Sequence, residues 1–298
     1  MKPLVSVIVP TYRRDEYLKR ALKSLATQTI SDFEIVLVDD NDESSWNDKV
    51  ERIADEFKKE HPQISLICLQ NHPNLGSAEA RNAGARMARG DYITFLDDDD
   101  IYLPDKLRNQ CEFMISGKLD FSITELALYY DDGTFCEYRK RDYLKKSDSR
   151  SLLEYHMMYH MTGTDTMMFY KPYFESVGGF APIDVGDEFY LMERAIQGGG
   201  KFSCLNRCDV KAFVHRTEAG LSGGQSKIDG ENNLFEYKKT FFAEFERKSV
   251  RYIKMRHHAV LAFAYFRRKK IIKFFKEAIV SFAIDPMCCI KLFLSIVK

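Results

Sequence analysis

The chain has 298 residues, 45% hydrophobic and 30% charged, as in soluble globular proteins with room for one large domain or two. Basic and acidic residues balance at 44 each, but their distribution is uneven. Residues 247–298 hold thirteen Lys or Arg against two acids, a net of +11, so residues 1–246 carry −11. The acidity of this larger part argues against nucleic acid as the partner.

The cysteines and the apolar segments indicate the cellular compartment. Seven cysteines, an odd number without disulfide-like spacing, favour a reducing environment. Cys204 and Cys208 lack the second Cys or His pair that a zinc site requires. Residues 1–10 hold too short an apolar core for a signal peptide, and no run of about 18 apolar residues is present to span a membrane. We therefore predict a cytoplasmic protein.

The N-terminal third alternates short apolar runs with stretches whose apolar residues recur at helical spacing. This alternation predicts βαβ units, and therefore a parallel sheet with helices on both faces. Because such crossovers are right-handed, the C-terminal ends of the strands share one edge of the sheet. Strands are expected at residues 4–9, 33–38, 64–69 and 92–96, and helices at residues 17–25, 50–57 and 77–88.

The rest of the chain is less regular until it becomes helical. Residues 121–130 and 134–138 flank Asp131-Asp132-Gly133, which predicts a hairpin with a tight turn. The Gly/Ser-rich residues 220–230 are predicted to be mobile and to lie near a domain edge. Further strands are expected at residues 166–170 and 210–214, a helix at residues 189–197, and only helices beyond Asn233.

Four consecutive aspartates, Asp97 to Asp100, directly follow the fourth apolar strand. The C-terminal edge of an open α/β sheet is where ligands bind, and residues 10–12 and 39–40 are expected at the same edge. Clustered carboxylates repel one another, which raises their pKa values unless a cation neutralises them. Mg²⁺ or Mn²⁺ prefers such oxygen ligands. The alternative is a solvated acidic turn, but such a turn needs no strand directed at it.

Several motifs in order resemble the family 2 glycosyltransferases with the GT-A fold, similar to bacterial cell-surface polysaccharide enzymes. These motifs are Val5–Tyr12, Val38–Asp40, Asn74–Gly76, Ala80–Gly84 and Gly90–Asp100. The ordered set covers about the first 105 residues, and weaker matches continue to about residue 225. The resemblance implies an α/β, Rossmann-like fold with a mixed, mostly parallel sheet, flanking helices and a C-terminal helical region. It also implies a UDP-sugar donor, a divalent metal on the diphosphate, and inversion at the anomeric carbon.

The resemblance assigns nucleotide contacts to the strand ends. Tyr12 would stack on the base, although a half-buried loop tyrosine is the alternative. Asp40 would accept the uracil N3–H, while Asp39 would share that role or cap the next segment. Arg81 would reach the base or the diphosphate, with a surface salt bridge as the alternative. The expected nucleotide-binding residues are Pro10, Thr11, Tyr12, Asp39, Asp40, Arg81, Asp97 and Asp98.

The aspartate run resembles the DxD element of the family. On that basis Asp99 is the expected direct metal ligand, Asp98 lies near the ribose, and Asp97 holds the metal or its waters. Asp100 is expected to cap the segment that leads to Pro104. His215, after a predicted strand, completes the metal set of Asp97, Asp99 and His215 for Mn²⁺ or Mg²⁺, with a structural histidine as the alternative.

A mobile cover over the diphosphate is expected from the residues after His215. Residues 220–224 are rich in glycine, and their backbone amides could face phosphate oxygens as a lid. Arg216 or Lys227 would help to stabilise the departing UDP.

An acidic pair precedes Arg194, as it does in the family. Inversion requires a base that takes the proton of the acceptor hydroxyl, and a carboxylate suits this role. Aligning the motif on Arg194 places Glu188 at the base position with Asp187 beside it, although the order of the two acids is the reverse of the usual one. Glu188 is our predicted base and Asp187 the alternative. Two acids that merely favour a helix N-terminus would be the structural explanation.

The C-terminal region is apolar and basic. Residues 259–266, 271–284 and 288–297 are apolar helical stretches, and Arg267–Lys270 form a basic interruption. Basic amphipathic helices lie in membrane interfaces and favour anionic lipids, whereas packing on the core or formation of a homodimer is the alternative. We predict a nucleotide-sugar-binding catalytic domain over residues 1–228 and a helical region over residues 229–298 that lies peripherally on the inner face of the cell membrane.

Together these patterns predict a metal-dependent inverting transferase. It would move a hexose or N-acetylhexosamine from a UDP-sugar to a hydroxyl of a glycan or lipid-linked glycan, in the synthesis of capsule, O-antigen or a similar polysaccharide. A non-catalytic nucleotide-sugar-binding protein on the same fold is one alternative. A sugar nucleotidyltransferase is disfavoured, because residues 10–14 lack the glycines of its phosphate loop. The sequence leaves open the donor sugar, the acceptor, the linkage and the oligomeric state.

Overall fold

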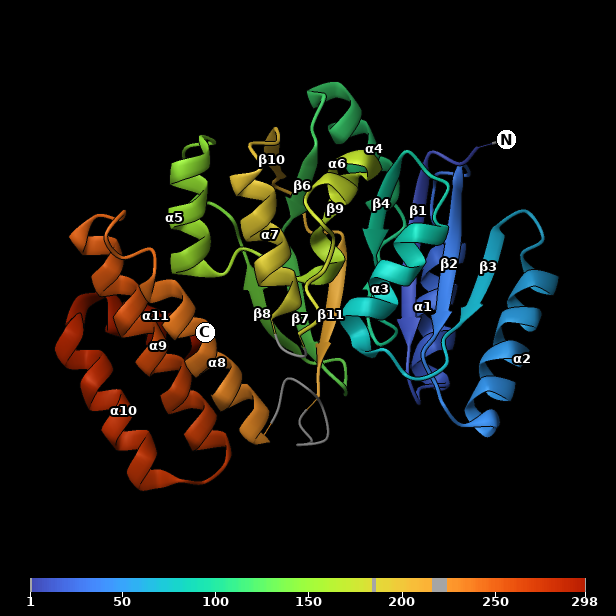
Figure 1. Ribbon diagram of the computed structural model, residues 1–298. Coiled ribbons are helices and arrows are strands. Elements are labelled where there is room, and N and C mark those ends of the chain that lie inside the picture. The colour runs from blue at the N-terminus through green and yellow to red at the C-terminus, as the bar shows by residue number, and fades with distance from the viewer. Residues whose placement is uncertain (1, 184–185, 216–223, 298) are drawn as a thin grey trace. The chain divides into compact units, whose positions relative to one another are not determined.

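The computed structural model describes residues 2–183, 186–215 and 224–297. The chain forms two compact units, one of Met1–Ser149 with Met161–Val214 and one of Arg150–His160 with His215–Lys298. The first unit contains the sheets, and the second is helical (Figure 1). The domain boundary predicted after residue 228 stays a prediction.

The large sheet of the first unit has seven strands in the order β10-β6-β9-β4-β1-β2-β3 (Figure 1). Neighbours from β4 to β3 are parallel, as are β10 and β6, whereas β9 runs antiparallel to both β4 and β6. The predicted mixed, mostly parallel sheet is therefore confirmed. The strands are β1 Val5–Thr11, β2 Phe33–Asp39, β3 Ser65–Gln70, β4 Tyr92–Phe95, β6 Phe121–Thr124, β9 Met168–Tyr170 and β10 Phe202–Leu205.

Helices follow the strands as the apolar spacing predicts. In α1 the side chain of Asp15 caps the backbone N–H of Glu16, and Leu18, Leu22 and Leu25 are buried. In α3 the small residues permit close packing, because a Cβ at Gly84 would lie 2.5 Å from the Ile8 side chain of β1. The helices of this unit are α1 Glu16–Ala26, α2 Ser44–Glu60, α3 Gly76–Met87, α4 Lys106–Gly117, α6 Lys171–Ser176 and α7 Asp187–Gln197, with a 3₁₀ turn, η1, at Thr164–Thr166.

A smaller sheet has the order β5-β11-β7-β8. The predicted hairpin is confirmed for β7 and β8, but residues 121–124 belong to the large sheet instead, so that part of the prediction is wrong. The chain changes sheets at Glu125, whose N–H donates to the Arg207 carbonyl at 3.0 Å. The strands are β5 Ile101–Tyr102, β7 Leu126–Tyr130, β8 Phe135–Arg139 and β11 Val210–Val214.

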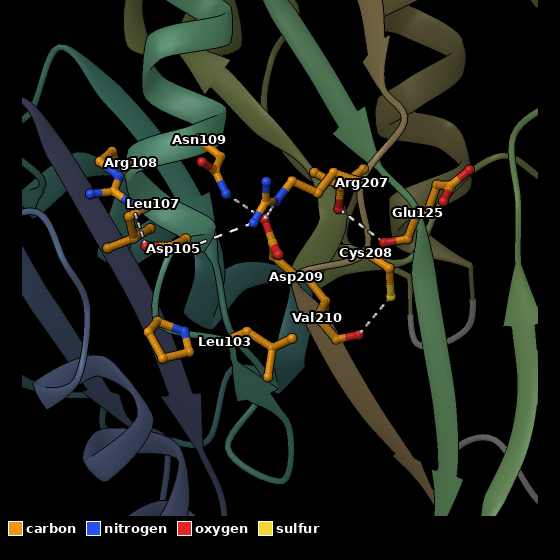
Figure 2. A network of polar contacts seen from close by, with 12 residues as sticks. Leu103, Asp105, Leu107, Arg108, Asn109, Glu125, Arg207, Cys208, Asp209 and Val210 are labelled. Carbon is orange, nitrogen blue, oxygen red and sulfur yellow. Dashed lines mark hydrogen bonds and ion pairs between the residues drawn. The ribbon is translucent and has the colours of Figure 1, made fainter.

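A polar network fixes the start of β11 beside β5 and α4 (Figure 2). The Asp209 carboxylate accepts hydrogen bonds from Asn109 Nδ2 at 2.8 Å and from Arg207 Nε at 2.7 Å. The Asp209 carbonyl accepts from the N–H of Leu103 at 2.9 Å. Strand β11 is thereby held next to the segment that follows the four aspartates.

The second unit consists of helices. Residues 234–297 are helical apart from the short connections at residues 240–246, 268–270 and 285, as predicted. Of the Gly/Ser-rich segment, residues 224–230 form the start of α8. Ile228 packs against Leu261 and Ala264, and this packing overrides the weak helix propensity of glycine. The mobility predicted for this segment stays a prediction. The helices are α5 Ser149–Tyr159, α8 Gly224–Lys239, α9 Arg247–Arg267, α10 Ile271–Ile284 and α11 Pro286–Val297. Within the described ranges, none is both long and apolar enough to cross a bilayer.

A lysine side chain lies in the core of the first unit. Lys106, at the start of α4, is completely buried. Its Nζ donates to Thr94 Oγ1 at 2.7 Å and lies 3.9 Å from the centre of the Tyr102 ring. Burial lowers the pKa of Lys106 to about 7. The folded protein therefore holds this amine neutral at a pH where the unfolded chain protonates it.

This difference predicts a pH-dependent stability. Between pH 7 and the ordinary lysine pKa of 10.5, the unfolded state binds a proton that the folded state does not, so the free energy of unfolding should rise with pH. Lys106→Met should remove that contribution, which amounts to at most about 1.4 kcal/mol per pH unit. Urea unfolding across this range measures it. Lys59→Met, at an exposed lysine of α2, should keep the wild-type profile; parallel profiles for all three proteins would show that Lys106 is charged when folded.

Candidate functional site

The ends of β1, β2 and β4 meet at one edge of the large sheet, as the topology predicts. Thr11 is in register with Asp39, and the N–H of Asp40 donates to the Thr11 carbonyl at 3.0 Å. The Thr11 hydroxyl donates to Asp98 Oδ2 at 2.7 Å. Segments distant in the sequence are thus joined by direct hydrogen bonds.

Arg14 neutralises part of the aspartate run. Its Nη1 lies 3.1 Å from Asp98 Oδ1 and also pairs with the carboxylate of Asp99. Burial raises the pKa of Asp98 to about 7, although Arg14 opposes the shift. The Asp99 carbonyl accepts from Arg20 Nη2 at 2.6 Å. Sequence reasoning did not select Arg14, although its position two residues after Tyr12 was an available signal.

The carboxylates of Asp97, Asp100 and Asp165 form a group that fits a metal ion. Ligand oxygens of Asp97, Asp100 and Asp165 lie within 4.8 Å of one another. Asp165 Oδ1 accepts from the N–H of Asp97 at 2.7 Å. Burial, followed by the charge of Asp97, raises the pKa of Asp165 to about 7; burial and the charge of Asp165 raise the pKa of Asp100 well above its usual range. A hard divalent cation would relieve this repulsion.

Two of these residues differ from the sequence-based expectation. Asp165 lies in η1, 68 residues beyond Asp97, and no local pattern marked it. Asp100 was expected to cap the segment before Pro104; instead its Oδ1 accepts from the N–H of Phe213 in β11 at 2.8 Å. Tertiary contact with β11, rather than the local turn, fixes the orientation of Asp100.

Arg81 joins the aspartate run to the acidic pair. The side chain is buried, so the alternative of a surface salt bridge is wrong. Its Nη2 donates to Asp97 Oδ1 at 2.6 Å and its Nη1 donates to Asp187 Oδ2 at 2.8 Å. Burial opposes its charge, but the carboxylates of Asp97 and Asp187 outweigh burial and raise the pKa of Arg81. One guanidinium therefore connects the two acidic motifs.

The acidic pair opens α7 as predicted. Asp187 is buried, and its Oδ1 accepts from the N–H of Glu188 at 2.9 Å. Burial raises the pKa of Asp187 to about 7, against the opposing charge of Arg81. Glu188 is more exposed than Asp187. Arg194 ties the helix to the preceding turn, since its Nε donates to the Val177 carbonyl at 2.9 Å.

Asp39 and Asp40 are both buried and hold neighbouring loops. Asp40 accepts from Asn71 Nδ2 at 2.9 Å and from the backbone N–H groups of Leu75 at 3.0 Å and Gly76 at 2.9 Å. Asp39 binds the segment after β2, including the Asn47 side chain at 2.8 Å, which agrees with its capping role. Recognition of uracil by Asp40 stays a prediction.

The remaining predicted residues occupy different environments. Pro10 lies in β1, and Tyr12 is 43% exposed with the guanidinium of Arg13 5.1 Å from its ring centre. His215 follows β11 and is the first residue of the second segment of the second unit. The predicted lid at residues 220–224, Arg216 and the Lys227 side chain lie outside the described residues, apart from the backbone of Gly224 and Lys227 in α8.

Sequence comparison identifies the family. The profile described as Glycosyl transferase family 2 matches residues 6–176, more than half of the chain. The chain belongs to this family. The match includes β1, the four aspartates, Arg81 and Asp165. The resemblance noted from the motifs is confirmed.

Curated relatives match about half of the chain. An uncharacterised glycosyltransferase of Methanocaldococcus jannaschii, MJ1057, is 34% identical over 162 residues, 53% of this chain and 54% of that protein. WfaP of Escherichia coli, named as a UDP-Glc:alpha-D-GlcNAc-diphosphoundecaprenol beta-1,3-glucosyltransferase, is 33% identical over 132 residues, 44% of this chain and 48% of that protein. The chain thus spans about half the length of these relatives.

Solved structures share the fold over most of the chain. TarS of S. aureus in complex with UDP-GlcNAc has a TM-score of 0.61 at 18% identity and covers 94% of this chain and 91% of that chain. The mannosyltransferase PcManGT of Pyrobaculum calidifontis, in complex with GDP-Man and Mn²⁺, has a TM-score of 0.60 at 19% identity and covers 90% of this chain and 74% of that chain. At these identities the comparison establishes the GT-A-like fold.

The buried Arg81 bridge can be tested by truncation. Arg81→Met should destabilise the protein by about 3–5 kcal/mol, because it leaves the buried carboxylate of Asp187 uncompensated. The loss should be smaller below pH 7 than above it, since protonation neutralises Asp187, whose pKa is about 7. Urea unfolding at both pH values measures the two effects.

Arg86 supplies a matched control on the same helix. Its side chain is 63% exposed and pairs with Glu79 at 2.7 Å, so Arg86→Met should cost less than about 1 kcal/mol. Equal losses for the two arginine variants would contradict the bridge as a stabilising interaction.

Proposed function

We propose that this protein transfers a sugar from a UDP-sugar to an acceptor hydroxyl, with inversion at the anomeric carbon. The observation that carries the proposal is the Arg81 bridge, because it places the aspartate run and the Asp187-Glu188 pair in one constellation. The run suits a nucleotide diphosphate with its cation, and the pair suits an acceptor hydroxyl. Family membership and the UDP-GlcNAc complex of TarS support a nucleotide-sugar donor.

We propose a Mg²⁺ or Mn²⁺ site that includes Asp97. Asp97 belongs both to the set predicted from the motif, with Asp99 and His215, and to the geometric group with Asp100 and Asp165. The all-carboxylate donor set fits a hard divalent cation, and Mn²⁺ is present in the PcManGT complex. When bound, such an ion would offset the negative charge that develops on the departing diphosphate.

Side chains of the protein would carry out the proton transfer and bind the nucleotide. A carboxylate of the acidic pair takes the proton of the acceptor hydroxyl as its oxygen bonds to the anomeric carbon, while the bond from that carbon to the diphosphate oxygen breaks on the opposite face. We assign this role to Glu188, because Asp187 is buried and bound to Arg81. The exposed ring of Tyr12 offers a stacking surface for the base, and Asp98 would lie near the ribose.

The proposed acceptor is a glycan on a lipid carrier, in the synthesis of a cell-surface polysaccharide at the cytoplasmic face of the membrane. The diphosphoundecaprenol-linked acceptor in the name of WfaP supports this class. In this scheme residues 1–228 bind the donor and perform the transfer, and the basic residues 229–298 serve the acceptor side.

Donor and metal binding are tested together by thermal shift. Wild-type protein should be stabilised more by UDP with Mn²⁺ than by either alone, because each offsets the other's electrostatic cost. Asp97→Asn should lose this Mn²⁺-dependent gain, and Asp91→Asn, at a 49% exposed aspartate just before β4, should retain it. GDP in place of UDP serves as the comparison. A gain that is unchanged in Asp97→Asn would remove the metal from this site.

Two further variants separate the alternative ligand sets. Loss of the Mn²⁺-dependent gain in Asp99→Asn but not in Asp165→Asn would support the set predicted from the motif. The opposite result would support the group of Asp97, Asp100 and Asp165.

The base is tested by an isosteric pair of variants. Glu188→Gln cannot accept a proton, so acceptor-dependent UDP release should fall by about 10²-fold or more while UDP binding stays similar. Asp187→Asn should mainly lower stability, since it weakens the Arg81 bridge. If Asp187→Asn abolishes turnover and Glu188→Gln remains active, the roles of the two acids are reversed. If the wild-type protein binds UDP but shows no acceptor-dependent UDP release, the protein is a non-catalytic binding protein.

A further inference from the structure

Helix α10 presents an uncovered apolar strip. Ile272, Phe275, Ile279 and Phe282 are 88%, 57%, 66% and 49% exposed. Spacings of three, four and three residues place these side chains on one side of the helix. The other side is packed, since Ser281 is buried and its hydroxyl donates to the Met255 carbonyl of α9 at 2.9 Å. The strip is therefore the outward face of a helix that is otherwise anchored.

Helix α11 repeats the arrangement. Met287, Ile290 and Leu294 follow one another at spacings of three and four residues and are all exposed. Cys288 and Cys289, on the other side, are partly buried. Within the described residues, no other pair of consecutive helices leaves so many large apolar side chains uncovered. Scattered apolar residues are ordinary on a protein surface, but two such strips on consecutive helices are not.

The charge beside the strips is positive. Lys273 and Lys276 lie on α10 and Lys291 on α11, and all three are exposed. The two acids of these residues are already paired with basic side chains, Glu277 with His258 at 2.7 Å and Asp285 with Arg251 at 2.9 Å. Among the described residues of the two helices, the exposed charged side chains are therefore all lysines.

We propose that the apolar strips of α10 and α11 insert into the interface of an anionic lipid bilayer. Apolar side chains would enter the boundary between head groups and acyl chains, while Lys273, Lys276 and Lys291 bind lipid phosphates. Long aliphatic lysine stems suit this position, because they keep the ammonium in water beside a buried apolar surface. Neither helix needs to cross the bilayer for this contact.

A second copy of the chain fits the same surface less well. A two-fold interface would place two copies of this lysine-bearing surface against each other without exposed acids from α10 or α11, and like charges brought together are repelled. Anionic lipid supplies the missing negative charge. Only the purpose of docking, which is to hold the enzyme where a lipid-linked acceptor lies, rests on the proposed function. Lipid binding itself can be measured without any sugar transfer.

Vesicle sedimentation tests the proposal with the full chain. Wild-type protein should sediment with vesicles of equimolar phosphatidylcholine and phosphatidylglycerol, and much less with pure phosphatidylcholine. Ile272→Glu combined with Ile279→Glu should weaken binding about tenfold or more, because it places two acids in the strip. Lys273→Glu combined with Lys276→Glu should also weaken binding, and added salt should reduce wild-type binding by screening.

The matched control places the same charges elsewhere. Ile115→Glu combined with Met87→Glu alters two residues of the first unit that are 49% and 45% exposed, and it should bind vesicles like the wild type. UDP-induced thermal stabilisation, measured in every variant, separates failure of docking from failure of the proposed donor site. Ile272→Glu alone, at an 88% exposed position, repeats the test with little risk to folding.

Three results would overturn docking. One is the absence of wild-type binding to anionic vesicles, and another is equal binding by the strip and control variants. The third is a wild-type dimer in light scattering that becomes monomeric in the strip variant while vesicle binding is absent, which would assign the strips to a second copy.

Discussion

The buried ion-pair bridge made by Arg81 organises the site. A guanidinium taken out of water is costly unless its charge is compensated, and here two carboxylates from distant segments compensate it. Asp97 comes from the end of β4, Asp187 from the start of α7, and Arg81 from α3 between them in space. Each carboxylate in turn depends on the same cation. The relative position of the two acidic motifs is therefore fixed by charge as well as by packing.

Around this bridge the protein concentrates more negative charge than it neutralises. Arg14 and Arg81 pair with Asp98, Asp99, Asp97 and Asp187, whereas Asp100 and Asp165 contact mainly backbone donors and each other. The pKa values of Asp98, Asp165 and Asp187 all rise to about 7 because burial disfavours their charged forms. Such a group is poised to bind a cation or a proton, and either would complete the charge balance. This property connects the site to the diphosphate chemistry proposed for the protein.

The helical unit differs from the first unit in its charge and in its exposed surface. Its charge is positive, Glu277 and Asp285 are paired with basic side chains of α9, and α10 and α11 expose apolar strips. In the proposed scheme the first unit binds a small, highly charged donor, whereas α10 and α11 contact an extended lipid surface. In this scheme the opposite charges of the two parts of the sequence serve two kinds of partner, so the net charge of zero describes neither part.

The sequence by itself determined the secondary-structure elements of the N-terminal third and the glycosyltransferase family. Apolar runs and helical periodicity placed β1 to β4, α1 and α3 within a few residues, because those segments obey local rules, whereas α2 begins at Ser44, six residues before the predicted start. The motifs identified the family by resemblance, and the parallel topology predicted that their residues meet, since such strands bring their C-terminal ends to one edge whatever lies between them. Long-range contacts were decided only by the tertiary structure. Asp165 joins Asp97 across 68 residues, and Arg81 reaches Asp187 across 106, without any local pattern that marks either partner. The glycine-rich start of α8 became helical because Ile228 found a buried site against α9. Burial and charge compensation depend on which segments meet in space, and that information is not contained in the spacing of residues along the chain.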